Sequence, residues 1–282
     1  MPTFGAHAFI WVGDWTPEAG SFAIAAAATA GVDLIEIPML RPERFDAPRH
    51  KAELETAGIR AICSLVLPPE AHMPAAPDAA RAFLERALDQ VAAVGSDFLG
   101  GVLYGNLGTL SGQPPTADER AVCAETLRGV AAYAAEHGIT LGLEPVNRYE
   151  TYLFNTIADT LALIDTIGAE NVTIHADTYH MNVEEPGFSG PIEAAEPRLG
   201  CIHLSESDRG VPGQGNVQWD DVFAGLARIN YRGPLVLESF AAINPDLAGA
   251  TCMWRTPSYT SDELVREGVA FLRAKAAAVG LV

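Results

Sequence analysis

The amino-acid sequence predicts an α/β protein, a (β/α)8 TIM barrel, from three observations. The 282 residues are 49% hydrophobic, which is ample for a large core. Short apolar segments alternate eight times with longer amphipathic ones. The short segments are nearly continuous in apolar residues, as strands of a parallel sheet covered on both faces require. We therefore expect one barrel domain spanning residues 1–282.

Each predicted strand is followed by a predicted helix. The strands are expected at 4–10, 33–39, 59–67, 97–105, 139–145, 172–178, 199–207 and 234–240. The helices are expected at 16–30, 43–57, 77–94, 117–137, 156–168, 187–197, 218–229 and 260–278. Thr16, Thr116 and Thr260 are start signals, and five of the helices end in a glycine, at Gly31, Gly58, Gly95, Gly138 and Gly168.

A doubly wound open sheet is the competing topology. The glycine-rich dinucleotide fingerprint that would favour it is absent after the first strand. The longest irregular stretches, 105–116 and 241–259, both follow predicted strands. In a barrel, the loops after the strands form the active face.

Composition excludes several classes of protein. The formal net charge is −18, which disfavours nucleic acid because phosphate binding needs a basic face. The N-terminus lacks the basic region of a signal peptide, and the most apolar run, "GSFAIAAAATAGV", is too short to span a bilayer. No CxxC pair occurs among Cys63, Cys123, Cys201 and Cys252. We expect a cytoplasmic protein with reduced thiols and no membrane contact.

The last four predicted strands each end in a side chain that can bind a metal ion. These are Glu144, Asp177, His203 and Glu238, spaced by 33, 26 and 35 residues. Each spacing is about one βα unit, so a barrel places the four side chains on neighbouring strands at its C-terminal mouth. Single acids at such positions could instead cap helices or pair with Lys or Arg. Four in consecutive units favour a metal site, because a charge near a core is costly unless it is paired or metal-bound.

Three carboxylates and one imidazole are typical ligands of a hard divalent ion. They favour Mn²⁺ or Mg²⁺, with Co²⁺ as a further candidate, whereas structural zinc would use more sulfur or nitrogen.

Further polar residues follow these strand ends and are expected around the metal. Glu150 follows Glu144, His180 follows Asp177, and Glu206, Asp208 and Arg209 follow His203. His180 and Arg209 suit sugar hydroxyls and carbonyl oxygens. Asn147 and Arg148 are expected to brace the loop, and His175 to be a satisfied core histidine.

At these residues the sequence resembles a known family. "GLEPVNRYETYLFNT", "HADTYHMNVEE", "HLSESDRGVPGQGNVQW" and "LVLESF" resemble the ketose 3-epimerases, the D-tagatose/D-psicose 3-epimerase family of the xylose-isomerase-like (β/α)8 group. The resemblance covers most of 139–240 and continues at "TCMWR" (251–255). The segments "GAHAFIW" and "SLVLPPE" fall where the family lines the far end of the sugar, and "VLYGNLGTL" retains Tyr104.

The resemblance implies a sugar substrate, a divalent cofactor and a role for each site residue. Glu144, Asp177, His203 and Glu238 would be the metal ligands, with Glu144 and Glu238 also the acid/base pair. Glu150, His180 and Arg209 would bind the O1–O3 end of the ketose. A homodimer or homotetramer is implied by the resemblance alone.

The implied reaction inverts C3 of a free ketose. A divalent ion on O2 and O3 would stabilise a cis-enediolate, while one glutamate removes the C3 proton and the other returns a proton on the opposite face. The main alternative is an aldose–ketose isomerase of the same superfamily, of the hydroxypyruvate isomerase kind. An endonuclease IV-type enzyme would need a His-rich metal cluster and a basic groove, and a non-catalytic sugar binder has no need of two metal-bound glutamates.

Overall fold

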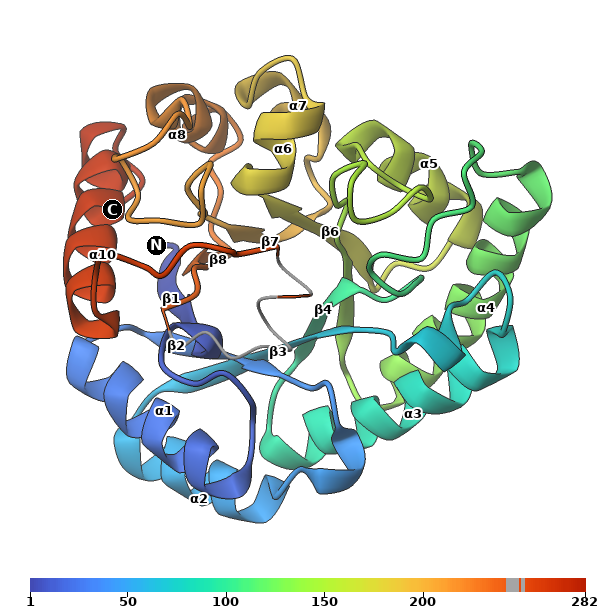
Figure 1. The fold of residues 1–282 in the computed structure, drawn as a ribbon, viewed down its shortest axis with the longest axis horizontal. Coiled ribbons are helices and arrows are strands. Elements are labelled where there is room, and N and C mark those ends of the chain that lie inside the picture. The colour runs from blue at the N-terminus through green and yellow to red at the C-terminus, as the bar shows by residue number, and fades with distance from the viewer. Residues whose placement is uncertain (242–248, 250–251) are drawn as a thin grey trace.

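The computed structural model describes residues 1–241, 249 and 252–282, and a closed barrel of eight parallel strands lies at its centre (Figure 1). The strands follow one another around the barrel in chain order, and β8 closes it by pairing with β1. They are β1 (Thr3–His7), β2 (Leu34–Pro38), β3 (Arg60–Val66), β4 (Phe98–Val102), β5 (Thr140–Leu143), β6 (Val172–Asp177), β7 (Leu199–His203) and β8 (Pro234–Leu237). The predicted fold class is confirmed.

Helices form a ring outside the strands (Figure 1). They include α1 (Pro17–Ala30), α2 (Ala47–Ala57), α3 (Pro77–Val94), α4 (Ala117–Glu136), α5 (Ile157–Ile167), α6 (Thr178–Glu184), α7 (Ser189–Ala194), α8 (Trp219–Arg228) and α10 (Ser261–Ala278). Thr116 and Thr260 begin α4 and α10 with capping boxes. Gly31, at φ 70°, ends α1 in the left-handed conformation that glycine adopts without a Cβ clash.

Several predicted boundaries were wrong. The strands predicted at 4–10 and 199–207 end earlier, at His7 and His203, and residues 8–10 form a 3-10 turn. Residues at the mouth of the barrel stay buried beyond the last hydrogen-bonded pair of the strands. Burial therefore does not mark where a strand ends. The helix α6 was missed and α7 is shorter than the predicted 187–197, since no Gly or Pro separates β6 from α6.

The barrel interior is packed with side chains. Its lower layer is a cluster of five buried residues from five strands, namely Leu34, Ile62, Phe98, Cys201 and Val236. Gly142 on β5 leaves room for this layer, because a Cβ there would come within 2.4 Å of the Phe98 ring. The interior is therefore a core, and functional side chains have space only at its upper end.

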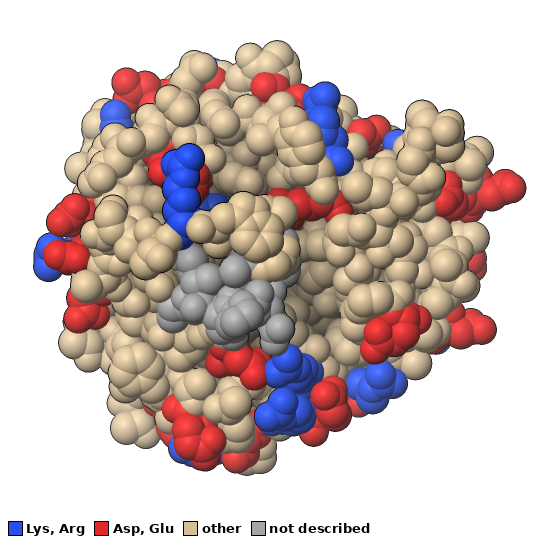
Figure 2. Space-filling view, viewed as in Figure 1, with Lys and Arg blue, Asp and Glu red and all other residues tan. Residues whose placement is uncertain are grey.

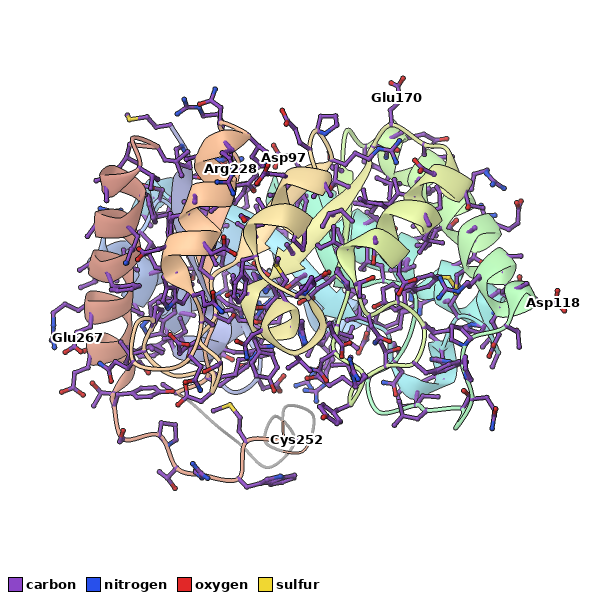
Figure 3. All side chains as sticks on the ribbon, turned by 90° about the horizontal axis from the view of Figure 1, so that it is seen from above. Asp97, Asp118, Glu170, Arg228, Cys252 and Glu267 are labelled. Carbon is purple, nitrogen blue, oxygen red and sulfur yellow. The ribbon has the colours of Figure 1, made fainter. Side chains whose placement is uncertain are left out.

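The two ends of the barrel are distinguished in a side view. Glu170, which shortly precedes β6, projects from one end, and Cys252, which comes after β8, lies at the other (Figure 3). The loops that follow the strands lie at the end with Cys252. Thr251, the first residue of the segment 251–255, lies outside the described residues, as does most of 241–251.

Two other expectations concern the whole chain. Among the described residues, no helix is both long and apolar enough to cross a bilayer. The four cysteines are free thiols, of which Cys252 alone is exposed. One domain over residues 1–282 stays a prediction.

Candidate active site

The four side chains predicted as metal ligands meet at the C-terminal mouth of the barrel. Glu144 directly follows β5, Asp177 ends β6, His203 ends β7 and Glu238 directly follows β8. All four are buried. A register shift between Ile174 and His175 brings Asp177 opposite His203 on the neighbouring strand. Irregularities of this kind re-aim side chains beside active sites.

The distances show one compact cluster. Ligand atoms of Glu144, Asp177 and His203 all lie within 4.8 Å of one another. The Nδ1 atom of His203 is 3.9 Å from Oε1 of Glu144 and 3.3 Å from Oε2 of Glu238. The structure therefore brings together every side chain of the predicted ligand set.

The cluster fits a divalent cation. Its donors are carboxylate oxygens and one imidazole nitrogen, a mixed set suited to Mn²⁺, Mg²⁺ or Co²⁺. Within the described part of the chain, the buried Nδ1 atom of His203 has no hydrogen-bond partner. The other ring nitrogen, Nε2, lies 2.8 Å from Oε2 of Glu36, an outer carboxylate of the kind that commonly orients a metal-binding histidine.

Arg209 crosses the cluster from the loop after β7. Its guanidinium donates to Asp177 at 2.7 Å and to Ser205 Oγ at 3.0 Å, and it also pairs with Glu238. The same group lies over the ring of Tyr179, 4.1 Å from the centroid. Its backbone is left-handed, with φ 59°, an unfavourable conformation that tertiary contacts must hold.

His180 enters the site as a hydrogen-bond donor. Its Nδ1 accepts the backbone N–H of Asn147 at 3.1 Å, so Nε2 carries the proton when the ring is neutral. Burial lowers the pKa of His180 to about 4, which keeps the ring neutral. Nε2 lies 3.7 Å from a carboxylate oxygen of both Glu144 and Asp177. The side chain of Asn147 also donates to Glu150, at 2.8 Å, and holds that carboxylate beside His180.

A pocket of about 210 Å³ opens above these groups. Its lining includes Glu144, Glu150, His180, His203, Arg209 and Glu238 from the second half of the barrel. The first half contributes His7, Phe9, Pro38, Leu40, Ser64, Leu65, Val66, Gly101, Val102, Asn106 and Leu107. The segments "GAHAFIW" and "SLVLPPE" therefore line the same pocket as the predicted ligands. A larger groove of about 970 Å³ between α1 and α10 has only one acidic lining residue, Asp262.

Comparisons with known proteins agree with this geometry. Residues 24–275 match the family model described as a xylose isomerase-like TIM barrel. The L-ribulose 3-epimerase of Methylomonas sp. (strain DH-1) is 39% identical over 278 residues, covering 96% of this chain and 97% of the relative. The ketose 3-epimerase of Arthrobacter globiformis is 36% identical and covers 98% and 97%. The chain belongs to the ketose 3-epimerase family.

A solved structure supports the same assignment. The crystal structure of a Methylomonas sp. D-allulose 3-epimerase in complex with D-allulose superimposes with a TM-score of 0.93. It is 38% identical in sequence, with 97% of each chain covered. The chain is thus an enzyme of the ketose 3-epimerase kind, and the xylose-isomerase-like fold expected from the resemblance is confirmed.

In this ketose 3-epimerase the two glutamates of the predicted acid/base pair have opposite electrostatic environments. Burial raises the pKa of Glu144 well above its usual value. Burial also acts to raise the pKa of Glu238, but the charges of Arg209 and His203 outweigh it and hold that pKa well below its usual value. Opposite shifts of this kind are typical of carboxylates with different proton-transfer tasks.

The expectation that Glu206 faces the metal was wrong. Its carboxylate turns into its own loop and accepts four hydrogen bonds, from Ser207 N, Gly213 N, Val217 N and Trp219 Nε1, at 2.8–2.9 Å. The same loop carries Arg209, whose carbonyl oxygen accepts hydrogen bonds from Ser239 and from Tyr259, the latter at 3.0 Å. Glu206 therefore organises the loop that presents Arg209.

Two residues brace the strand end at Glu144 from outside the pocket. Arg148 makes a bidentate pair with Glu184, with contacts of 2.8–3.2 Å, which ties the loop after β5 to α6. Tyr104 does not line the pocket. Its hydroxyl donates to the carbonyl oxygens of Glu144 and Phe154, at 2.8 and 3.2 Å. This contact holds the backbone of Glu144 in place.

His175 is a core histidine, as expected, but it is not satisfied by hydrogen bonds. It is fully buried, and neither ring nitrogen has a partner within the described residues. Its ring packs edge-on against His203, with centroids 4.1 Å apart. Burial lowers its pKa to about 3, so the ring stays neutral.

The sequence reasoning missed Glu36 and His7. Glu36 lies on β2, fully buried, and touches His203 across the barrel. A signal was available, because Glu36 interrupts the apolar run Leu34–Ile35–Ile37. A carboxylate inside an apolar strand is as unusual as one at its end, and it carries the same implication of a buried partner.

Proposed function

We propose that this enzyme is a divalent-metal-dependent ketose 3-epimerase that inverts C3 of a free ketose through a cis-enediolate. D-tagatose, D-fructose/D-psicose and L-ribulose are the candidate substrates. The main support is the cluster of Glu144, Asp177, His203 and Glu238 around Nδ1 of His203, for which the described residues provide no hydrogen-bond partner. Relatives that carry ketose 3-epimerase names cover almost the whole chain and support the reaction class.

The four clustered residues would hold the metal ion, for which we propose Mn²⁺, with Mg²⁺ and Co²⁺ as alternatives. A bound divalent cation polarises the substrate carbonyl and stabilises negative charge that develops on the adjacent oxygens. The negative charge of the carboxylates would offset the charge of the cation inside a buried site.

Glu144 and Glu238 would perform the proton transfers. They directly follow β5 and β8, which are separated by two strands, and their carboxylate oxygens lie 3.9 and 3.3 Å from Nδ1 of His203. One carboxylate removes the C3 proton, leaving the enediolate, and the other delivers a proton to the opposite face of C3. Two groups are needed, since a single group on one face would regenerate the starting sugar.

Glu150, His180 and Arg209 would hold the oxygens at the O1–O3 end of the ketose. All three line the pocket. His180 offers an N–H through Nε2, and Arg209 offers several N–H groups that carboxylates now share. Glu150 is an acceptor for a sugar hydroxyl, and burial raises its pKa.

Solvent isotope exchange tests the reaction. The protein is incubated with Mn²⁺ in D₂O and with each of D-tagatose, D-fructose, D-psicose and L-ribulose, and the products are followed by NMR. We expect the C3 epimer to form with deuterium at C3. Deuterium that enters only at C1 or C2 would contradict the proposal and indicate the aldose–ketose isomerase instead.

Metal dependence is tested on the same protein. Removal of metal with a chelator should abolish epimer formation, and added Mn²⁺ should restore it more effectively than Mg²⁺ or Co²⁺. Full activity after exhaustive chelation would remove the metal from the proposal.

Two further proposals concern the cellular location and the oligomeric state of the protein. We infer a cytoplasmic homodimer or homotetramer. Light scattering on the purified protein, with a measured mass of two or four times 29.9 kDa, would support the assembly.

A further inference from the structure

A fourth carboxylate, that of Glu36, approaches the candidate metal site from the other half of the barrel. Glu36 lies on β2, where alternation with the buried residues Ile35 and Ile37 turns its side chain into the barrel interior. The side chain is fully buried. A charge in such a position is very costly unless it is paired, so its contacts indicate its role.

Glu36 contacts one nitrogen of each of two histidines. Its Oε2 atom accepts from Nε2 of His203 at 2.8 Å, and its Oε1 atom lies 3.8 Å from Nε2 of His7. Nδ1 of His7 accepts the backbone N–H of Phe9 at 3.1 Å, so the His7 proton is on Nε2, the atom nearer Glu36. The 2.8 Å contact with His203 is the shorter of the two, and an ionised carboxylate offers only acceptor atoms to these N–H groups.

The acceptor at Nε2 determines which nitrogen of the His203 ring can bind a cation. Because Nε2 must donate to Glu36, the lone pair available for a cation is on Nδ1. Nδ1 is the atom that lies 3.3 Å from Glu238 and 3.9 Å from Glu144. We propose that Glu36 is a positioning residue, which holds His203 as the Nε2–H tautomer and in the orientation that lets Nδ1 bind the divalent cation.

This inference rests on the metal site of the proposed function and adds to it a residue from the other half of the barrel. Neighbouring groups allow one alternative role for Glu36. Ligand atoms of Glu36, His175 and Cys201 also lie within 4.8 Å of one another, one layer deeper in the barrel. Glu36 could then be a ligand of a second ion, and the experiment must separate the two roles.

The test measures Mn²⁺ affinity directly, without turnover. Metal-free wild type and variants are titrated with Mn²⁺, and free Mn²⁺ is quantified by electron paramagnetic resonance. Glu36→Gln keeps the size of the side chain but removes the charge and allows the amide to present either a donor or an acceptor to His203. We expect one site per chain in both proteins, with an affinity roughly 10- to 100-fold weaker in Glu36→Gln. Glu36→Asp should recover part of the loss.

Cys201→Ser is the matched control. Cys201 is buried in the same part of the interior but makes no hydrogen bond to His203 among those of the described residues. Its replacement should change the Mn²⁺ affinity by less than about threefold, since the ligand geometry is untouched. A loss in Cys201→Ser as large as that in Glu36→Gln would overturn the assignment, because general disturbance of the interior or a second ion would then explain both.

The remaining outcomes are also decisive. Wild type that binds no Mn²⁺ up to millimolar concentration would overturn the metal site itself and the inference with it. Wild type that binds Mn²⁺ while Glu36→Gln binds equally well would overturn the inference alone. Two Mn²⁺ per wild-type chain, reduced to one in Glu36→Gln, would make Glu36 a ligand of a second ion.

A wild-type measurement covers the case in which Glu36→Gln does not fold. In protein with ¹⁵N-labelled histidine and bound Mg²⁺, the His203 ring should show a proton on Nε2. The signal is assigned by its absence from His203→Gln. An unprotonated Nε2 in the Mg²⁺-bound protein would overturn the proposal.

Discussion

The two halves of the barrel mouth differ in the side chains that their strands present. Each of β5 to β8 ends at, or is directly followed by, a candidate metal ligand, and the segments behind these strands add His180 and Arg209. The first half of the barrel lines the same pocket mainly with apolar or small residues such as Phe9, Val66 and Gly101, and its polar lining residues are His7, Ser64 and Asn106. Charged residues elsewhere on the face shown are scattered between tan surface areas (Figure 2).

We propose that the charged half performs the proton transfers and that the apolar half sets the shape of the pocket. Buried charges are stable only where they compensate one another, and Arg209 pairs with both Asp177 and Glu238 in the charged half. We propose that the apolar half shapes the space for the rest of the sugar. Glu36 is the exception in this half, because it lies on β2 but contacts His203 of β7. Substitutions in the two halves should therefore affect different kinetic parameters.

The largest effect is expected at Glu238. Glu238→Gln removes both a proposed proton-transfer group and a ligand, so kcat should fall by roughly 10³-fold or more, which is an effective loss of turnover. Epimer formation measured by chromatography checks it. Glu170→Gln is the control, since Glu170 is an exposed carboxylate at the opposite end of the barrel (Figure 3). More than a tenth of wild-type activity in Glu238→Gln would refute the assignment.

A pair of variants at His180 isolates its donor. In His180→Asn the amide oxygen can replace Nδ1 and accept from Asn147, but the N–H that faces Glu144 is lost. In His180→Gln the amide nitrogen can replace Nε2 as donor. We expect kcat/KM to fall roughly 100-fold in the first variant and clearly less in the second, as measured by steady-state kinetics. Equal losses would show that the Nε2 proton is not what matters.

A smaller effect is expected at Glu206, in the loop that carries Arg209. Glu206→Gln should lower kcat/KM roughly 10-fold by loosening this loop, and should lower the free energy of unfolding by about 2 kcal/mol at neutral pH. Asp208→Asn is the matched control, because among the described residues Asp208 accepts one such bond, from Gly210 N. Equal destabilisation in the two variants would contradict the bracing role.

The pH dependence of this stability difference follows from the pKa of Glu206. Burial acts to raise that pKa, but hydrogen bonds from the loop lower it below the usual 4.5. A carboxyl whose pKa is lower in the folded state stabilises the protein above its unfolded pKa, and this contribution is lost as the pH falls through the folded pKa. The difference in unfolding free energy between wild type and Glu206→Gln should therefore be constant above pH 5 and shrink below 4.5. Denaturant titrations across that range measure it.

The smallest effect is expected in the apolar half. Val66→Ala removes two methyl groups from a half-buried wall, so KM should rise about fivefold or less while kcat stays unchanged, because the contact is uniform along the reaction. Val183→Ala, on α6 and outside the pocket lining, is the control. A large fall in kcat for Val66→Ala would break the division between chemistry and shape.

The sequence predicted more of the charged half than of its surroundings. Glu144, Asp177, His203 and Glu238 were found because residues one βα unit apart must meet at the mouth of a closed barrel. The helix α6 and the early end of β7 were not found, because residues stay buried across both boundaries and no Gly or Pro marks either of them. The direction of Glu206 was predicted wrongly, since a carboxylate in a polar loop has no periodic pattern that says which way it points.

The sequence alone determined the barrel and the four strand-end side chains, because both follow from repeated spacing along the chain. The tertiary structure decided which partners those side chains have. Glu36 and His203 are 167 residues apart, and only closure of the barrel brings them to 2.8 Å. Likewise, Nδ1 of His180 accepts from Asn147 because of how α6 packs against the loop after β5. Such contacts depend on side-chain rotamers and on burial, and these are set by the packing of the whole barrel.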